Sequence, residues 1–198
     1  MLPTPENPLV LIYSGNTPAM KNSTKVSLAV GDDGNTHISS VGRSKTVRTW
    51  LNRTSGDAEE QMENQGFSLI PMPYRVGAWV RIGFYLALKS KAVMSKQDAD
   101  NAYTSIQETW QKTVISDDRQ VVDYHVSEMT VRSRPALFSV ALLWSLDPQK
   151  ALDDNYCTDQ FVSVYNRYKD QRIWELVRSA NTKPVSRLQP MHLKDKRL

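Results

Sequence analysis

The sequence has little of what metal centres, disulfide scaffolds and membrane spans require. Its single cysteine, Cys157, excludes a disulfide within the chain. The three histidines lie far apart in the sequence, so we expect no metal and no cofactor. No apolar stretch reaches the roughly 20 residues of a membrane-spanning helix, and residues 1–15 lack the basic start of a secretory signal. These absences predict a protein that is not secreted, in the cytoplasm or nucleus.

Signatures of catalysis and of nucleic-acid recognition are also lacking. No glycine-rich phosphate loop, nucleophile elbow, zinc finger or aromatic RNA-binding motif occurs. Cys157 and His125 are the one conceivable nucleophile pair, although a lone cysteine at a helix start is more often a small buried residue. We therefore predict that the protein is not an enzyme, and an unrecognised enzyme that depends on Cys157 or His125 remains an alternative.

Acidic residues are absent from Phe67 to Met94, the longest stretch of low polarity. From Val76 to Leu88 every second residue is apolar, a period typical of a strand with one buried face. Gly77 and Gly83 argue against a helix, since each costs about 1 kcal/mol relative to alanine there. This stretch predicts a long central strand. Its other face is mixed and carries Trp79, Tyr85 and two cations.

The remaining patterns predict one α+β domain over residues 1–180, with a mostly antiparallel sheet and two main helices. Helical spacing is clearest over residues 96–114, and a last helix opens at Thr158 and runs to about Ala180. The other expected elements are a strand at 9–13, a hairpin over 25–41, a short helix capped by Ser44, an acidic loop at 55–66, a strand at 121–131 that is half exposed or at an edge, and a buried strand at 138–146.

A second stretch without acids, residues 34–56, collects basic side chains around Trp50. Cations beside an aromatic residue suit the phosphates of RNA or of lipid headgroups. Alternatively, Trp50 belongs to the core and the cations are a solvated helix face, which the neighbouring acidic segment neutralises. The candidate residues for binding an anionic surface are Arg43, Lys45, Arg48 and Arg53.

The net charge of +4 resides at the C-terminus, because residues 1–180 hold equal numbers of acidic and basic side chains. A basic and flexible tail over residues 181–198 can hold an anionic partner, or it can simply be solvated. Its candidate binding residues are Lys183, Arg187, Lys194, Lys196 and Arg197.

Two segments resemble the matrix proteins of rhabdoviruses in the order of their elements. VRIGFYLALKSKAVMSKQDADNAYTSIQETW (80–110) is similar to that family's strand-to-helix segment, and VSEMTVRSRPALFSVALLWSLD (126–147) to its later strand pair. The animal-virus members carry a basic N-terminal tail and a PPxY motif. Here the basic tail is C-terminal, and Pro71-Met72-Pro73-Tyr74 is not such a motif.

The resemblance implies a viral structural protein of the virion and the host cytoplasm that has no enzymatic activity. Such a protein associates with itself, binds the nucleocapsid and links it to an acidic membrane surface. A viral coat or non-specific RNA-binding protein is the first alternative, because the same cations suit RNA phosphates. An unrecognised enzyme or a host-directed effector is the second.

Overall fold

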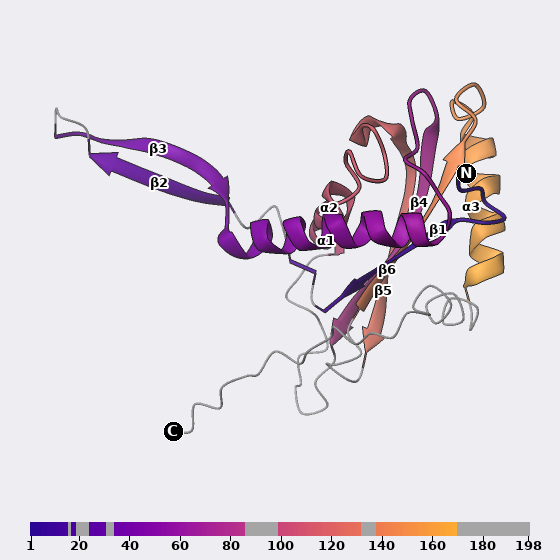
Figure 1. The fold of residues 1–198 in the computed structure, drawn as a ribbon, viewed down its shortest axis with the longest axis horizontal. Coiled ribbons are helices and arrows are strands. Elements are labelled where there is room, and N and C mark those ends of the chain that lie inside the picture. The colour runs from indigo at the N-terminus through magenta and orange to yellow at the C-terminus, as the bar shows by residue number, and fades with distance from the viewer. Residues whose placement is uncertain (16, 19–23, 31–33, 86–98, 132–137, 170–198) are drawn as a thin grey trace.

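A computed structural model describes residues 1–15, 17–18, 24–30, 34–85, 99–131 and 138–169 (Figure 1). The fold is α+β, with a mostly antiparallel four-stranded sheet, as the sequence predicts. Its elements are β1 (Leu9–Ser14), β2 (Thr24–Val30), β3 (Thr36–Arg43), α1 (Lys45–Asn64), β4 (Arg75–Tyr85), α2 (Ala99–Glu108), the 3₁₀ helix η1 (Asp118–Gln120), β5 (Val121–Val131), β6 (Phe138–Leu146) and α3 (Asp154–Tyr168).

The main sheet has the strand order β1-β6-β4-β5. Strand β6 pairs antiparallel with both β1 and β4, whereas β4 and β5 run parallel. A parallel pair needs a crossover connection, and α2 lies in the chain between these two strands. The predicted edge position of residues 121–131 is therefore confirmed, since β5 ends the sheet.

Both faces of the sheet are covered, so the molecule has three layers. On one face α1 and α2 pack over alternate residues of β4, among them Val76, Val80 and Ile82. On the other face α3 packs over Trp79 and Trp144. The expectation of a single buried face on this strand was wrong, because Trp79 is only 4% exposed beneath α3.

Helix α1 is longer than the sequence predicted. Ser44 caps it by accepting a hydrogen bond from the Val47 backbone, as expected. The predicted acidic loop at 55–66 was wrong, since the helix continues to Asn64. Ala58 and Met62, one turn apart, carry the buried stripe of the inner face through this polar segment.

Two glutamines, Gln61 of α1 and Gln65 at its C-terminal cap, close the outer edge of β1. The Gln65 amide accepts from the Val10 N–H at 3.0 Å and donates to the Val10 carbonyl oxygen at 2.7 Å. One turn earlier, Gln61 makes the same pair of bonds with Ile12, at 2.8 and 3.1 Å. A side-chain amide carries one acceptor and two donors, as a strand does. The two glutamines thus take the place of a fifth strand.

The predicted hairpin over 25–41 is confirmed, and it stands apart from the domain. Strands β2 and β3 form a separate two-stranded sheet that pairs only within itself. Figure 1 shows it projecting from the start of α1, away from the three-layered body. At its base, Arg43 makes an ion pair of 2.9 Å with Glu108 of α2.

One end of each of the other two helices differs from the prediction. Helix α2 starts at Ala99 and ends at Glu108, and the chain then makes turns around the buried Trp110. Helix α3 starts at Asp154, four residues before the predicted Thr158, because Asp153 caps the Asn155 backbone. Four predicted features lie outside the described residues: the start of the 96–114 helix, its Ser95 cap, the turn at 133–135 and the part of the last helix beyond residue 169.

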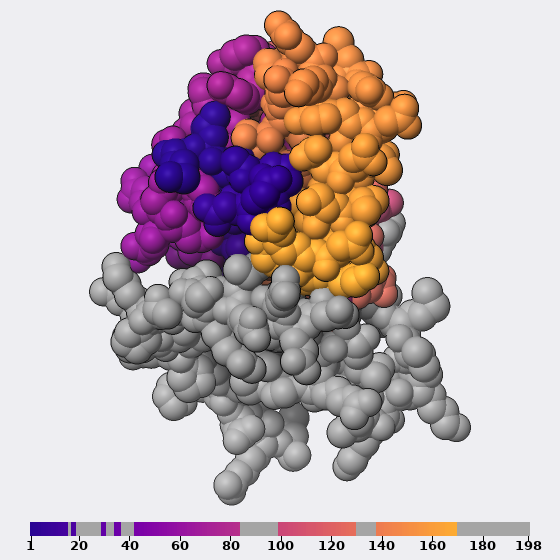
Figure 2. Space-filling view, turned by 90° about the vertical axis from the view of Figure 1, so that its right-hand side faces the viewer, coloured from indigo at the N-terminus to yellow at the C-terminus, as the bar shows by residue number. Residues whose placement is uncertain are grey.

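The N-terminal segment is irregular, as its prolines predict, and lies against α3. Arg167 Nη1 and the Tyr168 hydroxyl both donate to the Glu6 carbonyl oxygen, at 2.9 and 3.2 Å. Figure 2 shows these first residues, in indigo, beside the yellow end of α3. These two hydrogen bonds tie the N-terminal segment to the end of α3.

Substitution by alanine is expected to change the stability of the fold in opposite directions at two glycines. A Cβ at Gly77 would overlap the Trp144 indole, whereas a Cβ at Gly56 on α1 meets no atom within 4 Å. We expect Gly77→Ala to lower the free energy of unfolding by about 1–3 kcal/mol through overpacking. Gly56→Ala raises it by about 0.5–1 kcal/mol, since alanine is the better helix former. Urea unfolding of both variants measures this, and equal effects would contradict the packing described here.

Candidate functional site

Three of the four clustered cations lie on one helix. Lys45, Arg48 and Arg53 are exposed on the first half of α1, and the buried Val47, Trp50 and Leu51 hold the opposite side of the helix against the sheet. Trp50 is 7% exposed, so it is a core residue and not part of a binding surface. The sequence alternative that assigned Trp50 to the core is confirmed, and the cations remain on the surface.

Arg43 differs from the other three cations. It ends β3, one residue before the Ser44 cap, and its guanidinium is engaged with Glu108. This partly exposed ion pair links the hairpin to the body and partly neutralises the charge. Arg43 therefore contributes less to a free cationic surface than Lys45, Arg48 and Arg53, which we name the α1 cation group.

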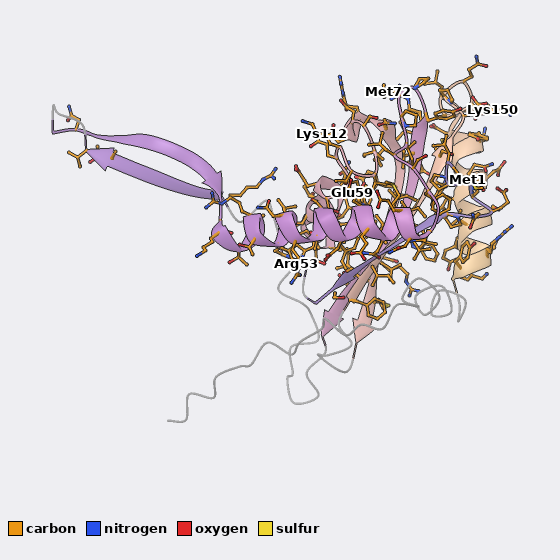
Figure 3. The ribbon with its side chains drawn as sticks, viewed as in Figure 1. Met1, Arg53, Glu59, Met72, Lys112 and Lys150 are labelled. Atoms are coloured by element: carbon orange, nitrogen blue, oxygen red, sulfur yellow. The ribbon has the colours of Figure 1, made fainter. Side chains whose placement is uncertain are left out.

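The second half of α1 is acidic. Its four carboxylates are exposed, and no cation lies among them: Asp57, Glu59, Glu60 and Glu63. Figure 3 labels Arg53 in the basic half and Glu59 in the acidic half. The helix keeps the two apart at 1.5 Å per residue, so Arg48 and Glu60 are about 18 Å apart along its axis.

Local neutralisation of the cations is limited to one neighbour pair. Burial raises the pKa of the Asp57 carboxyl, and the Arg53 charge one turn earlier opposes that rise. Among the described residues, no ion pair within 4.0 Å joins the two halves of α1. The expectation that the acidic segment could neutralise the patch thus holds for Arg53 only in part.

Cys157 and His125 are held in ways that do not suit a nucleophile and its base. Cys157 is 8% exposed, and its thiol donates to the Ala151 carbonyl oxygen at 3.7 Å. Burial raises the pKa of this thiol, and the negative charges of Asp123, Asp154 and Asp153 raise it further. The reactive species is the thiolate, and this environment disfavours it.

His125 belongs to a small cluster between β5 and α3. Its Nε2 lies 3.2 Å from Asp123 Oδ1, and its ring stacks on Phe161 at 3.4 Å between centroids. Burial raises the pKa of Asp123, and His125 opposes this. The pair was not singled out from the sequence, because only the pleat of β5 places Asp123 and His125 on the same face.

The remaining candidate residues are two histidines and the tail cations. His37 lies in β3, whereas His192 and the tail cations Lys183, Arg187, Lys194, Lys196 and Arg197 lie outside the described residues. Within the described ranges, no group of three or more histidine, cysteine or acidic residues could hold a metal ion. None of the helices in those ranges is long and apolar enough to cross a membrane.

An open hollow of about 470 Å³ lies between the turn before β4 and the end of β6. Its one ionisable acid is Asp147, whose carboxylate accepts from the Gln149 backbone at 2.8 Å and so serves the turn. The rest of its lining is mixed, namely Pro73, Tyr74, Ser145, Leu146, Pro148 and Gln149. The hollow offers no pair of groups for acid–base chemistry.

Comparison with known proteins adds no assignment, because no protein-family model and no curated protein matches the chain. The candidate site is therefore the α1 cation group beside the projecting hairpin.

Proposed function

We propose that this is a structural assembly protein of the matrix type without enzymatic activity. Copies associate with one another, and the α1 cation group, aided by the basic C-terminal tail, binds an anionic membrane surface and links it to a nucleocapsid. Its site of action is the virion and the host cytoplasm. The proposal joins the resemblance of residues 80–110 and 126–147 to the surface of α1.

One observation carries the proposal: the α1 cation group is exposed, and within the described residues only Arg53 has an acidic neighbour, Asp57. Lys45 and Arg48 have no ion-pair partner among the described residues, and the first turn of the helix contains no acid. A basic residue close to an acidic leaflet contributes about 1 kcal/mol to binding. Three such residues on one helix provide a modest but useful attraction.

The order of charges along α1 does not stabilise the helix. A helix is stabilised by acids at its start and bases at its end, by about 0.3–1 kcal/mol for each charge. Helix α1 has neither and instead has the reverse order. Because local stability does not account for this arrangement, a role in binding is the better explanation.

The protected state of Cys157 supports a protein without catalysis. A thiol with a raised pKa, on the buried side of α3 in the cluster with Trp79 and Trp144, is a core group. The enzyme alternative required the reverse, an accessible thiolate beside a free base. Removal of the thiol by Cys157→Ser is accordingly expected to leave assembly unchanged.

Flotation with lipid vesicles tests the proposed function. We expect the full chain to float with vesicles that contain phosphatidylserine and not with neutral phosphatidylcholine vesicles. Binding falls as salt rises, because salt screens the attraction. RNA added as a competitor leaves most of the protein on the vesicles. Retention by RNA with no flotation would contradict the membrane role and favour a coat or RNA-binding protein.

A further inference from the structure

The two edges of the main sheet differ in how their backbone groups are hydrogen-bonded. The outer edge of β1 is satisfied by Gln61 and Gln65, which bind the backbone of Val10 and Ile12. The opposite edge is β5, a strand of 11 residues. Among the described residues, no backbone or side-chain group pairs with its outer side. An open strand edge is a template for pairing with another strand.

Strand β5 has one bulge, at Val122 near its start, where the register with β4 shifts; from Asp123 on it lacks the usual protection of an edge. It contains no proline and no lysine, and it is as long as the central strand β4. Apolar side chains on it are open to solvent, with Val122 at 44% and Tyr124 at 53% exposure. Natural edges are kept short, bulged, covered or lysine-rich to prevent pairing. The edge of β5 is therefore suited to accept a strand.

The projecting hairpin is suited to supply that strand. An isolated two-stranded hairpin is marginally stable in water. Its register places Val26 opposite Val41 and Leu28 opposite Ile38, so two of its cross-strand pairs are apolar in sequence. At its far end Val30 is 70% exposed. Such a hairpin gains stability by pairing with a sheet, and in Figure 1 it points away from its own.

The β2–β3 hairpin and the edge of β5 match in length and are complementary in charge. The strands of the hairpin have 7 and 8 residues, which fit along the 11 residues of β5. Strand β5 carries Asp123 and Glu128, whereas β2 carries Lys25 and neither hairpin strand carries an acid. Opposite charges across a strand pair are favourable.

We propose that the β2–β3 hairpin of one copy adds to the β5 edge of a second copy and extends its sheet. The inference rests on the self-association in the proposed function and names the surfaces that perform it. Each copy then offers one hairpin and one acceptor edge, a head-to-tail arrangement. Such contacts build open-ended arrays when the rotation does not close a ring. An array of this kind suits a protein that coats a surface.

Disulfide cross-linking between two variants tests the contact. In a Cys157→Ser background, Ser27→Cys or Ser40→Cys places a thiol at mid-strand in the hairpin, where these two positions pair in the register. Val122→Cys or Tyr124→Cys places one on exposed positions of β5. Mixed full-length proteins are oxidised, and a disulfide needs Cβ atoms about 3.5–4.5 Å apart. We expect at least one mixed pair to yield a heterodimer as the main product.

The matched control uses Leu152→Cys, which is 85% exposed but lies in the turn before α3. Mixed with either hairpin variant, it is expected to give only background cross-linking. Hairpin pairs with β5 that do not exceed this background would overturn the proposal. So would a Val122→Cys protein that cross-links with itself in preference to the hairpin, since two β5 edges would then pair directly.

Replacement of residues 24–42 by a short glycine-serine linker distinguishes the proposed hairpin contact from self-association in general. The variant retains Arg43 and its partner Glu108, so we expect the melting temperature of the body to change little. Light scattering is expected to show a monomer where the full chain forms oligomers. Oligomers that persist without the hairpin overturn the contact but leave self-association standing. A full chain that is monomeric at every concentration overturns both.

Discussion

The double variant Gln61→Met, Gln65→Met is expected to lower the free energy of unfolding by about 2–6 kcal/mol. It removes four hydrogen bonds to the β1 backbone, each with a net contribution of about 0.5–1.5 kcal/mol. Methionine preserves the length and the helix propensity of glutamine, so the loss reports the amide groups alone. Urea unfolding followed by circular dichroism measures the change.

The control for this variant is Glu59→Met, Glu63→Met. These residues are also one turn apart on α1, but their side chains are exposed. We expect the control to unfold within about 0.5 kcal/mol of the wild type, as surface substitutions usually do. The double glutamine variant also exposes a second open edge, so its tendency to aggregate is expected to rise. Equal stabilities of the two double variants would show that the glutamines do not support β1.

Strong alternation in the sequence was enough to predict the strands. Val76, Ala78, Val80 and Ile82 all lie in the core beneath α1 and α2, as their spacing indicates. What alternation did not reveal was the second helical layer, which buries Trp79 on the opposite face. A period of two identifies the faces of a strand, but it does not identify what covers each face or which strand lies beside it. The parallel pairing of β4 with β5 is one such relation.

The second half of α1 could not be predicted because its apolar signal is weak. Ala58 and Met62 are the only buried apolar residues between Thr54 and Asn64, and Gly56 lowers the helix propensity further. Contacts with residues distant in the sequence compensate for this weak local signal. Gln61 bonds to Ile12, which is 49 positions away, and Gln65 bonds to Val10, which is 55 positions away. Those contacts are tertiary and leave no local pattern.

The candidate site was predicted in part. The absence of acids over residues 34–56 located the four cations, and the structure places three of them together on exposed turns of α1. The partner of Arg43 could not be anticipated, because Glu108 lies on a different helix. The edge position of β5 was one of two expectations drawn from its acids, whereas the lack of a partner strand on its outer side, within the described residues, became evident only with the sheet order.

The largest functional effect is expected for the triple variant Lys45→Ala, Arg48→Ala, Arg53→Ala. Each basic residue near an acidic leaflet contributes about 1 kcal/mol, so the three together account for about a hundredfold in affinity. All three are exposed, and alanine favours the helix, so the stability of the fold is preserved. Flotation with phosphatidylserine vesicles at low salt measures the loss.

The matched control is Glu59→Ala, Glu60→Ala, Glu63→Ala, which removes three charges of opposite sign from the other half of the same helix. We expect its vesicle binding to equal or exceed that of the wild type, since repulsion from the leaflet falls. An Arg43→Ala variant is expected to lose less than any member of the α1 cation group, because Glu108 already occupies that guanidinium. If the triple cation variant binds as tightly as the acidic control, the surface of α1 does not face the membrane, and the attraction belongs to the basic tail.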